Sequence, residues 1–261
     1  MAVLEEGDEV IIPSPYWLSY PEMVRIAGGV PVLVETTEAN NWKITPDQFE
    51  ENMTGLTKMI IINSPGNPTG AVYTADELKA LGDIALFEDI VILSDEIYEK
   101  LVYGDAKHVS IASISKELYD LTITVGGFSK AYSMTGWRLG YIAAPKAIAE
   151  AISSMQGHTT SNPCTFAQYG GLAAMTVENS FVEDLKAEYD MRRQFMLNKL
   201  NAIPNISVTE PEGAFYFLVN TTALGIKSVN LCDKLLTRYR VAAVPGIAFG
   251  NDNSIRLSYC T

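Results

Sequence analysis

Short runs of apolar and β-branched residues alternate with amphipathic stretches along most of the chain. Six runs have the composition of β-strands: Glu9 to Pro13, Val30 to Glu35, Met59 to Asn63, Ile90 to Ser94, Thr122 to Gly126 and Gly140 to Ala144. Strands that alternate with helices are typical of a largely parallel sheet with helices on both faces. The pattern therefore predicts an α/β fold whose large domain contains a mostly parallel, doubly wound sheet.

Capping residues mark the starts of two of the intervening helices. Thr74 and Glu77 form a capping box ahead of apolar positions with helical spacing. The sequence Thr45-Pro46-Asp47 opens another helix in the same way.

A longer helical stretch predicts the boundary between two domains. Residues from Asn179 to Ala202 are charged and helix-favouring, and the stretch is too long for a simple crossover between strands. We expect this helix to connect a large domain, residues 1–184, to a smaller α+β domain, residues 185–261. The predicted elements that follow are a strand at Ala214 to Val219, a helix at Val229 to Tyr239, and short strands at Val241 to Val244 and Ile255 to Tyr259.

Composition excludes several classes of partner and compartment. The formal net charge of -12 argues against binding to nucleic acid or to an anionic membrane. Cys164, Cys232 and Cys260 are odd in number and widely spaced, which fits a reducing compartment. His108 and His158 are too few and too separate for a metal site. Without a signal-peptide pattern or a membrane-spanning apolar run, we expect a cytoplasmic protein.

A lysine follows one of the predicted strands at a position suited to cofactor chemistry. Lys130 comes directly after Ser129, and Arg138 follows eight residues later. A lysine amine can form a Schiff base with an aldehyde cofactor, while a hydroxyl and a guanidinium hold its phosphate. Taken alone, a solvated lysine after a strand is the more common arrangement.

A carboxylate ends another predicted strand. Asp95 follows Ile90 to Ser94, and the carboxyl ends of parallel strands are where open α/β sheets bind their ligands. There it could hold a protonated ring nitrogen, and Tyr98 could reach an oxygen on the same ring. A core aromatic with a satisfied hydroxyl is the alternative interpretation of Tyr98.

Two further segments supply donors. Asn67 lies in the proline- and glycine-rich turn from Asn63 to Gly70, directly after a strand, although such turns are common at ordinary strand ends. Arg256 lies on a short alternating strand, where its planar guanidinium could clamp a substrate carboxylate or pair with one of the many acids of the chain.

These segments occur together and in order. They are Ser-Pro-Gly-Asn-Pro-Thr-Gly at 64–70, Ser-Asp-Glu-Ile-Tyr at 94–98, Gly-Phe-Ser-Lys at 127–130, Thr-Gly-Trp-Arg-Leu-Gly at 135–140 and Ile-Arg-Leu-Ser-Tyr at 255–259. The series resembles the fold-type I pyridoxal-phosphate aminotransferases, and most closely the bacterial aspartate aminotransferase branch of class I. The resemblance extends from Gly7 to Thr261.

The resemblance implies pyridoxal 5′-phosphate as cofactor and a role for each matching residue. Lys130 would carry the cofactor as the internal Schiff base and then move the proton between substrate Cα and cofactor C4′. Asp95 would face the pyridine nitrogen, and Asn67 and Tyr98 would donate to the ring oxygen. Arg256, with Asn67 nearby, would bind the substrate α-carboxylate.

The remaining matches concern the phosphate and the face of the cofactor ring. Ser129 and Arg138 match phosphate ligands, and Trp17 matches the aromatic residue that packs against the ring, although a structural aromatic is a fair rival there. Gly127 departs from relatives that carry a second serine, so phosphate binding is expected to depend more on Arg138 and on backbone donors.

The resemblance also implies a longer protein. Relatives carry a region before Gly7 that includes the first strand and a phosphate-binding helix start, and they continue beyond Thr261. We therefore interpret the chain as a fragment that binds the cofactor weakly. Its truncated small domain is expected to leave apolar surface uncovered around Phe215, Phe217 and Ile255.

The substrates implied are an L-amino acid, with aspartate favoured, and a 2-oxo acid such as 2-oxoglutarate. Alanine, aromatic amino acids and prephenate stay open, as do a C–S lyase or synthase of the same fold and an inactive fragment. A homodimer is implied, since the polar segment from Gly157 to Pro163 approaches the partner subunit in the resembled enzymes. From its composition alone, that segment is a surface loop.

Overall fold

The large domain is built on a six-stranded sheet. A computed structural model describes residues 1–176 and 180–261. The strands are β1 (Glu9–Ser14), β2 (Val30–Glu35), β3 (Thr57–Asn63), β4 (Val91–Asp95), β5 (Thr122–Gly127) and β6 (Gly140–Ala143), in the order β2-β1-β3-β4-β5-β6. All neighbouring pairs are parallel except β5 and β6, which are antiparallel. The predicted mostly parallel sheet is confirmed.

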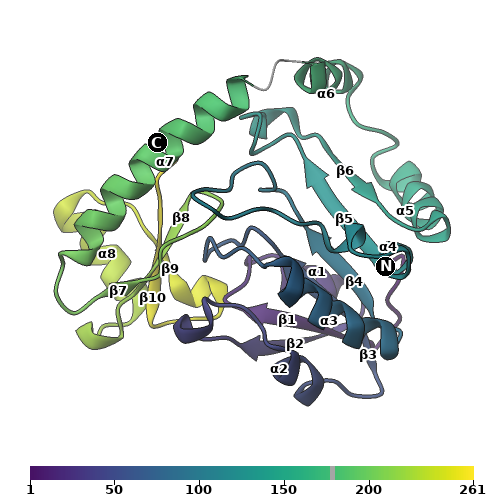
Figure 1. The fold of residues 1–261 in the computed structure, drawn as a ribbon, viewed down its shortest axis with the longest axis horizontal. Helices are drawn as coiled ribbons and strands as arrows, with labels where there is room; N and C mark the ends of the chain where they lie inside the picture. Colours follow the sequence, from purple (N-terminus) through teal and green to yellow (C-terminus); the bar gives the residue numbers. More distant parts are fainter. Residues whose placement is uncertain (177–179) are drawn as a thin grey trace.

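Helices pack on both faces of this sheet (Figure 1). The helices of this domain are α1 (Tyr20–Ile26), α2 (Pro46–Glu51), α3 (Ala75–Phe87), α4 (Lys116–Leu121), α5 (Lys146–Thr159) and α6 (Thr165–Thr176), with short 3-10 turns at η1 (Glu38–Asn40), η2 (Ile111–Ser113) and η3 (Thr135–Trp137). Helix α6 lies apart from the sheet, at the edge of the molecule in Figure 1. Both predicted capping boxes are present: Thr45 and Gln48 start α2, and Thr74 and Glu77 start α3. They satisfy backbone donors that have no partner within the first turn.

Alternation along the central strands divides the core between the two faces. Ile11 and Ile60 point toward α2 and α3, where they pack with Leu78. Val10 and Met59 point to the other face, in a cluster that also contains Val24 of α1. Successive side chains of a strand point in opposite directions, so a continuous apolar run fills both layers.

The smaller domain has its own antiparallel sheet. It contains α7 (Ser180–Asn201), β7 (Ser207–Val208), β8 (Tyr216–Asn220), η4 (Thr222–Leu224), α8 (Ser228–Tyr239), β9 (Val244–Pro245), η5 (Gly246–Phe249) and β10 (Ser254–Ser258), with strand order β7-β8-β10-β9. Figure 1 shows α7 running from the large domain to this sheet. The second α+β unit is thus confirmed, while the domain boundary at residues 184 and 185 stays a prediction.

Three details differ from the expected pattern. The strand predicted over Val241 to Val244 begins only at its last residue, because β9 starts there. The predicted loop from Gly157 to Pro163 is exposed, but its first three residues belong to α5. Asn179, where the long helix was expected to start, lies outside the described residues.

The three apolar side chains that were expected to lie uncovered in the small domain are not exposed. Phe215, Phe217 and Ile255 are all buried. They pack in one cluster with Tyr189, Leu197 and Leu200 of α7 and with Cys232 of α8. Residues of these two helices thus pack over Phe215, Phe217 and Ile255.

Within the described ranges, no helix combines the length and the apolar composition needed to cross a bilayer.

Candidate active site

The predicted residues are placed by the carboxyl ends of three adjacent strands. Asn63 of β3 is in register with Asp95 of β4, and Asp95 is in register with Val125 of β5. The backbone carbonyl of Asp95 accepts hydrogen bonds from Asn63 Nδ2, at 3.0 Å, and from the Ser64 amide, at 3.1 Å. These contacts hold the turn after β3 against the end of β4.

Asp95 reaches a mostly apolar cavity of about 500 Å³ on the α1 and α5 side of the sheet. Tyr20 donates a hydrogen bond of 2.5 Å to Asp95 Oδ2, and the Ile97 amide donates one of 3.1 Å to Oδ1. Burial raises the pKa of Asp95, an effect that the hydrogen bonds from Tyr20 and Ile97 oppose. Trp17 lines the same cavity and packs edge-on against Tyr20, with 5.3 Å between ring centroids.

Lys130 lies in the turn that follows β5, half-buried beside aromatic rings. Its Nζ is 5.8 Å from the ring centroids of both Tyr98 and Phe215. Burial lowers the pKa of Lys130, and the positive charges of Arg256 and Arg138 lower it further, against opposite effects from Cys260 and Asp95. The neutral amine, which is the nucleophilic form, is thereby favoured.

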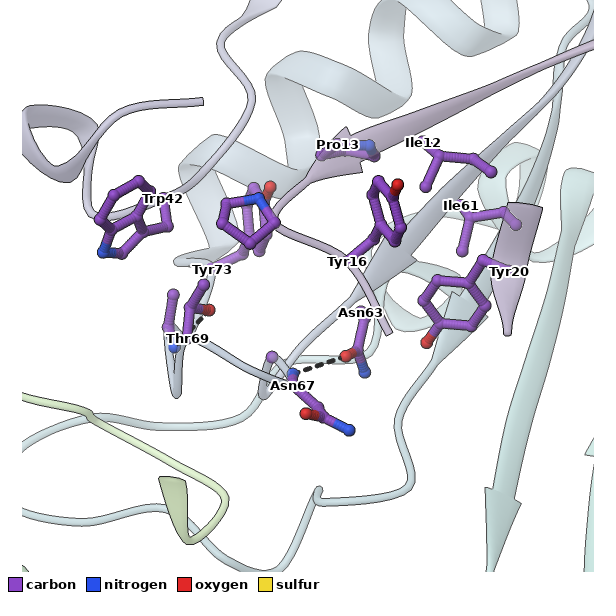
Figure 2. Close-up of a pocket in the computed structure, with 13 residues that line it drawn as sticks. Ile12, Pro13, Tyr16, Tyr20, Trp42, Ile61, Asn63, Asn67, Thr69 and Tyr73 are labelled. Carbon is purple, nitrogen blue, oxygen red and sulfur yellow. Dashed lines mark hydrogen bonds between the residues drawn. The ribbon is translucent and has the colours of Figure 1, made fainter. Parts of the chain in front are cut away.

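Tyr98 and Asn67 are each engaged by another side chain of the site. The hydroxyl of Tyr98 lies 3.0 Å from that of Tyr216, and burial raises the pKa of Tyr98. Asn67 Oδ1 accepts a hydrogen bond of 2.8 Å from Arg256 Nη1. The backbone amide of Asn67 donates to Asn63 Oδ1 at 2.8 Å, which fixes the turn (Figure 2).

Arg256 projects from β10 between two aromatic rings. Its guanidinium carbon is 4.3 Å from the ring centroid of Tyr216 and 4.8 Å from that of Phe249. Its Nε is buried and has no hydrogen-bond partner among residues 1–176 and 180–261. Arg256 is half-buried, and a planar guanidinium is a donor group suited to carboxylates; its role toward a substrate stays a prediction.

The predicted phosphate ligands are less enclosed. Arg138 is exposed, adopts a φ of 53°, and donates through Nη1 to the Thr135 carbonyl at 2.9 Å. Ser129 is half-buried beside Lys130. At Gly127, a Cβ would lie 3.0 Å from Ile97 Cδ1 and 3.2 Å from Gly140 Cα, so this strand end has little room for a larger residue. The phosphate role of Arg138 and Ser129 stays a prediction.

A second, small cavity lies on the other side of Tyr20. Figure 2 shows Tyr16, Tyr20, Asn63 and Asn67 among the residues that line it, and Trp42 closes its far end. Tyr20 lines both cavities, and its ring therefore lies between the Asp95 cavity and the turn that carries Asn67.

Sequence reasoning missed three residues of the site: Tyr20, Tyr216 and Phe249. Each is an aromatic residue in an apolar context, a pattern that predicts core packing. Trp17 precedes α1 and Tyr20 is its first residue, so no helical spacing links the two side chains in the sequence. The pairing of Arg256 with rings from β8 and η5 depends on how the small domain folds.

Comparison with known proteins settles the family of the chain. The family model for aminotransferase class I and II matches residues 1–261. The chain belongs to this family. It is 50% identical to the aspartate aminotransferase of Geobacillus stearothermophilus and 48% identical to that of Bacillus subtilis; each match covers 99% of this chain and 67% of the relative. The chain thus spans about two thirds of the length of these relatives.

Solved aminotransferase structures have the same fold. An aromatic aminotransferase from Pyrococcus horikoshii matches with a TM-score of 0.96 at 41% identity, over 100% of this chain and 70% of that one. A double mutant of the Thermus thermophilus aspartate aminotransferase matches with a TM-score of 0.95 at 42% identity, over 100% of this chain and 67% of that one. The resemblance drawn from the motifs is confirmed.

Proposed function

We propose that this aminotransferase chain transfers an amino group between an L-amino acid, with aspartate favoured, and a 2-oxo acid such as 2-oxoglutarate, using pyridoxal 5′-phosphate. The observation that carries the proposal is the setting of Lys130. Its amine is half-buried at the end of a parallel strand, with Asp95 and Arg256 near enough to influence its pKa. Nucleophile, carboxylate and guanidinium are the three groups that this chemistry requires.

The donor set fits the cofactor at the end of the apolar cavity that Asp95 and Trp17 line. That cavity is large enough to receive an aromatic ring, while Lys130 and Arg256 are not among its lining residues. Arg256 offers a half-buried planar guanidinium, hydrogen-bonded to Asn67, for a substrate anion. Pyridoxal phosphate, when bound, supplies an aldehyde for the amine and a ring that accepts electrons from the substrate Cα.

Each residue then has a defined task. Lys130, as a free amine, would take the proton from the substrate Cα and deliver it to the cofactor C4′. Asp95 keeps a proton on the ring nitrogen by staying ionised beside it. Arg256 holds the α-carboxylate with its planar donors, and Asn67, hydrogen-bonded to Arg256 at 2.8 Å, fixes the orientation of those donors.

Transamination is favoured over cleavage at Cβ or Cγ by the relatives. Their names include aspartate aminotransferase, aspartate/prephenate aminotransferase and asparagine–oxo-acid transaminase. All of these names describe transfer of an amino group, and they differ in the substrate that they name. They support aspartate or asparagine as the amino-group donor for this chain.

The proposal includes a homodimer in the cytoplasm. The three cysteines are free thiols, which is compatible with a reducing compartment. Helix α6 exposes large apolar side chains that a second copy would cover.

Peptide mapping tests the proposal. The protein is incubated with pyridoxal phosphate, reduced with borohydride and digested, and the pyridoxyl group is expected on Lys130. Lys100 is the matched control, because its Nζ also lies over a ring, 5.5 Å from the centroid of Tyr132. If the parent protein retains the label and Lys130→Ala does not, Lys130 is the site of the Schiff base. Label on Lys100 would show that the site is wrong. A parent protein labelled only away from Lys130 would refute the proposal.

A further inference from the structure

Tyr20 makes a contact with Asp95 that the roles above do not use. Its ring is buried at the first residue of α1, and its hydroxyl lies 2.5 Å from Asp95 Oδ2. The other carboxylate oxygen accepts only the Ile97 amide, at 3.1 Å, among the described residues. The carboxylate is therefore held by one donor on each oxygen, and Asp95 lines the cavity that Trp17 also lines.

We propose that Tyr20 is a positioning residue for the cofactor, which fixes Asp95 in its ionised form and orients its free lone pairs toward the ring nitrogen. The inference rests on the proposed function. It states that Tyr20 of α1 determines the ionisation and orientation of Asp95 of β4. Tyr20 touches neither substrate nor cofactor in this assignment and acts through Asp95.

The hydrogen bond has two opposed electrostatic effects. It disperses negative charge on Asp95, which weakens attraction to a ring proton, but it also stabilises the ionised carboxylate against the desolvation of its site. A neutral carboxyl could not hold the ring proton at all, whereas a hydrogen-bonded carboxylate still can. Burial is the largest influence on the pKa of Asp95 and raises it, and the hydrogen bond from Tyr20 is the largest influence that lowers it. Tyr20 therefore supports the ionised form of Asp95 against the effect of burial.

Within residues 1–176 and 180–261, Tyr20 is the side chain that donates a hydrogen bond to the Asp95 carboxylate. The ionisable groups that act on Asp95 besides Tyr20 are Glu96, whose charge raises the pKa of Asp95, and Lys130, whose charge lowers it. Tyr98 also lies near enough for Asp95 to raise its pKa, but its hydroxyl pairs with Tyr216. The amine of Lys130 would react with the cofactor aldehyde and would no longer act on Asp95 as a free ammonium group. With the cofactor bound, Tyr20 is left as the side-chain donor that supports the charge of Asp95.

The position of Tyr20 is itself fixed. Its backbone amide donates to the Trp17 carbonyl at 3.0 Å, and the two rings meet edge to face with an interplanar angle of 82°. The turn from Trp17 to Tyr20 thus ties the aromatic neighbour of the cavity to the donor for Asp95. Removing only the hydroxyl, by Tyr20→Phe, leaves this packing in place.

The test compares two ligands and needs no catalysis. One is pyridoxal phosphate; the other is its analogue in which the ring nitrogen is replaced by CH, which cannot be protonated there. Tyr20→Phe is expected to weaken pyridoxal phosphate binding roughly tenfold, on the scale of a charge-assisted hydrogen bond, and to change binding of the analogue by less than about twofold. A role in packing alone would weaken both ligands equally, and that result would overturn the proposal.

A titration of the protein without cofactor gives the second readout. The side-chain carboxyl carbon of Asp95 is followed by NMR and assigned by its loss in Asp95→Asn. Tyr20→Phe should move the midpoint to higher pH, because the hydrogen bond that opposes the effect of burial is gone. Tyr16→Phe is the matched control: Tyr16 is half-buried on the same segment and no hydrogen bond contributes to its pKa. An unchanged midpoint in Tyr20→Phe would also overturn the proposal.

The double variant separates this inference from the proposed function. In an Asp95→Asn background, Tyr20→Phe should have no further effect on the ratio of the two affinities, since it acts through Asp95. A parent protein that binds both ligands equally would instead show that Asp95 does not face the ring nitrogen. That outcome refutes the proposed function before Tyr20 is altered.

Discussion

Arg256 and Arg193 are both arginines over aromatic rings, but their surroundings give them different tasks. Arg193 is buried, lies over Tyr103, and pairs with Asp190 at 2.7 Å and with Glu210 at 2.6 Å. Arg256 has an amide partner in Asn67 and a buried Nε without one in the described ranges. A guanidinium with two carboxylates is satisfied within the chain, whereas one with a free donor is available to an anionic ligand.

Replacing each arginine by lysine distinguishes these tasks. Arg256→Lys keeps the charge and loses the planar fork, so kcat/KM should fall roughly 100-fold, or about 2.7 kcal/mol, by a similar factor for every amino acid tested. Arg193→Lys should lower the free energy of unfolding and leave kcat/KM nearly unchanged. If kcat/KM of Arg256→Lys fell only for dicarboxylic substrates, Arg256 would instead contact the side-chain carboxylate of the substrate.

At the residue scale, the sequence identified groups whose chemistry is unusual for their position and missed those with ordinary alternatives. Lys130, Asp95 and Arg256 are charged residues at the ends of strands or on them, which draws attention to them in any sequence. Tyr20 has the composition of a core residue and is also buried as one. Its second role depends on a contact 75 positions along the chain, which no local pattern encodes.

At the scale of elements, a helix can be recognised from its own residues while its packing cannot. The capping boxes of α2 and α3 were predicted and are present, because they need only residues three positions apart. Helix α6 has no comparable signal for its orientation. Its buried residues are Ala167, Gly171 and Ala174, so it packs through its smallest side chains.

Gly171 sets the closeness of this packing. A Cβ there would lie 2.4 Å from Leu139 Cδ2 and 3.4 Å from Phe128 Cζ, so Gly171→Ala should lower the free energy of unfolding by about 1–3 kcal/mol through overpacking. Gly157 lies in helix α5 with open space around it, and Gly157→Ala should raise stability by up to about 1 kcal/mol through helix propensity. Urea unfolding of both variants checks this, and equal shifts would show that α6 does not pack as described.

At the scale of the whole molecule, α6 exposes its large apolar side chains and buries its small ones, whereas a surface helix normally exposes polar residues. Phe166 is 70% exposed, Tyr169 71%, Leu172 61% and Met175 70%, while the small residues face inward. Figure 1 shows α6 at one end of the molecule, beyond β6. Large apolar side chains gathered on one helix indicate a contact with another protein surface.

This arrangement supports assembly of two copies through α6. The resemblance implied a homodimer, with the segment from Gly157 to Pro163 near the partner, and did not point to α6. The apolar period of α6 is compatible with a buried helix, so composition predicts burial without saying what covers it. The small domain shows the converse case. Its core was expected to need a further segment, but α7 and α8 already cover Phe215 and Phe217.

A charge on this surface tests the assembly. Leu172→Glu would place a carboxylate in the contact, where losing its hydration is costly, so the dimer dissociation constant should rise at least tenfold, or about 1.4 kcal/mol. Phe87→Glu is the control, because Phe87 is 87% exposed at the end of α3, on a different helix. Sedimentation equilibrium over a range of concentrations gives both constants. Equal constants for the parent and Leu172→Glu would remove α6 from the interface, and a parent that stays monomeric throughout would contradict the dimer itself.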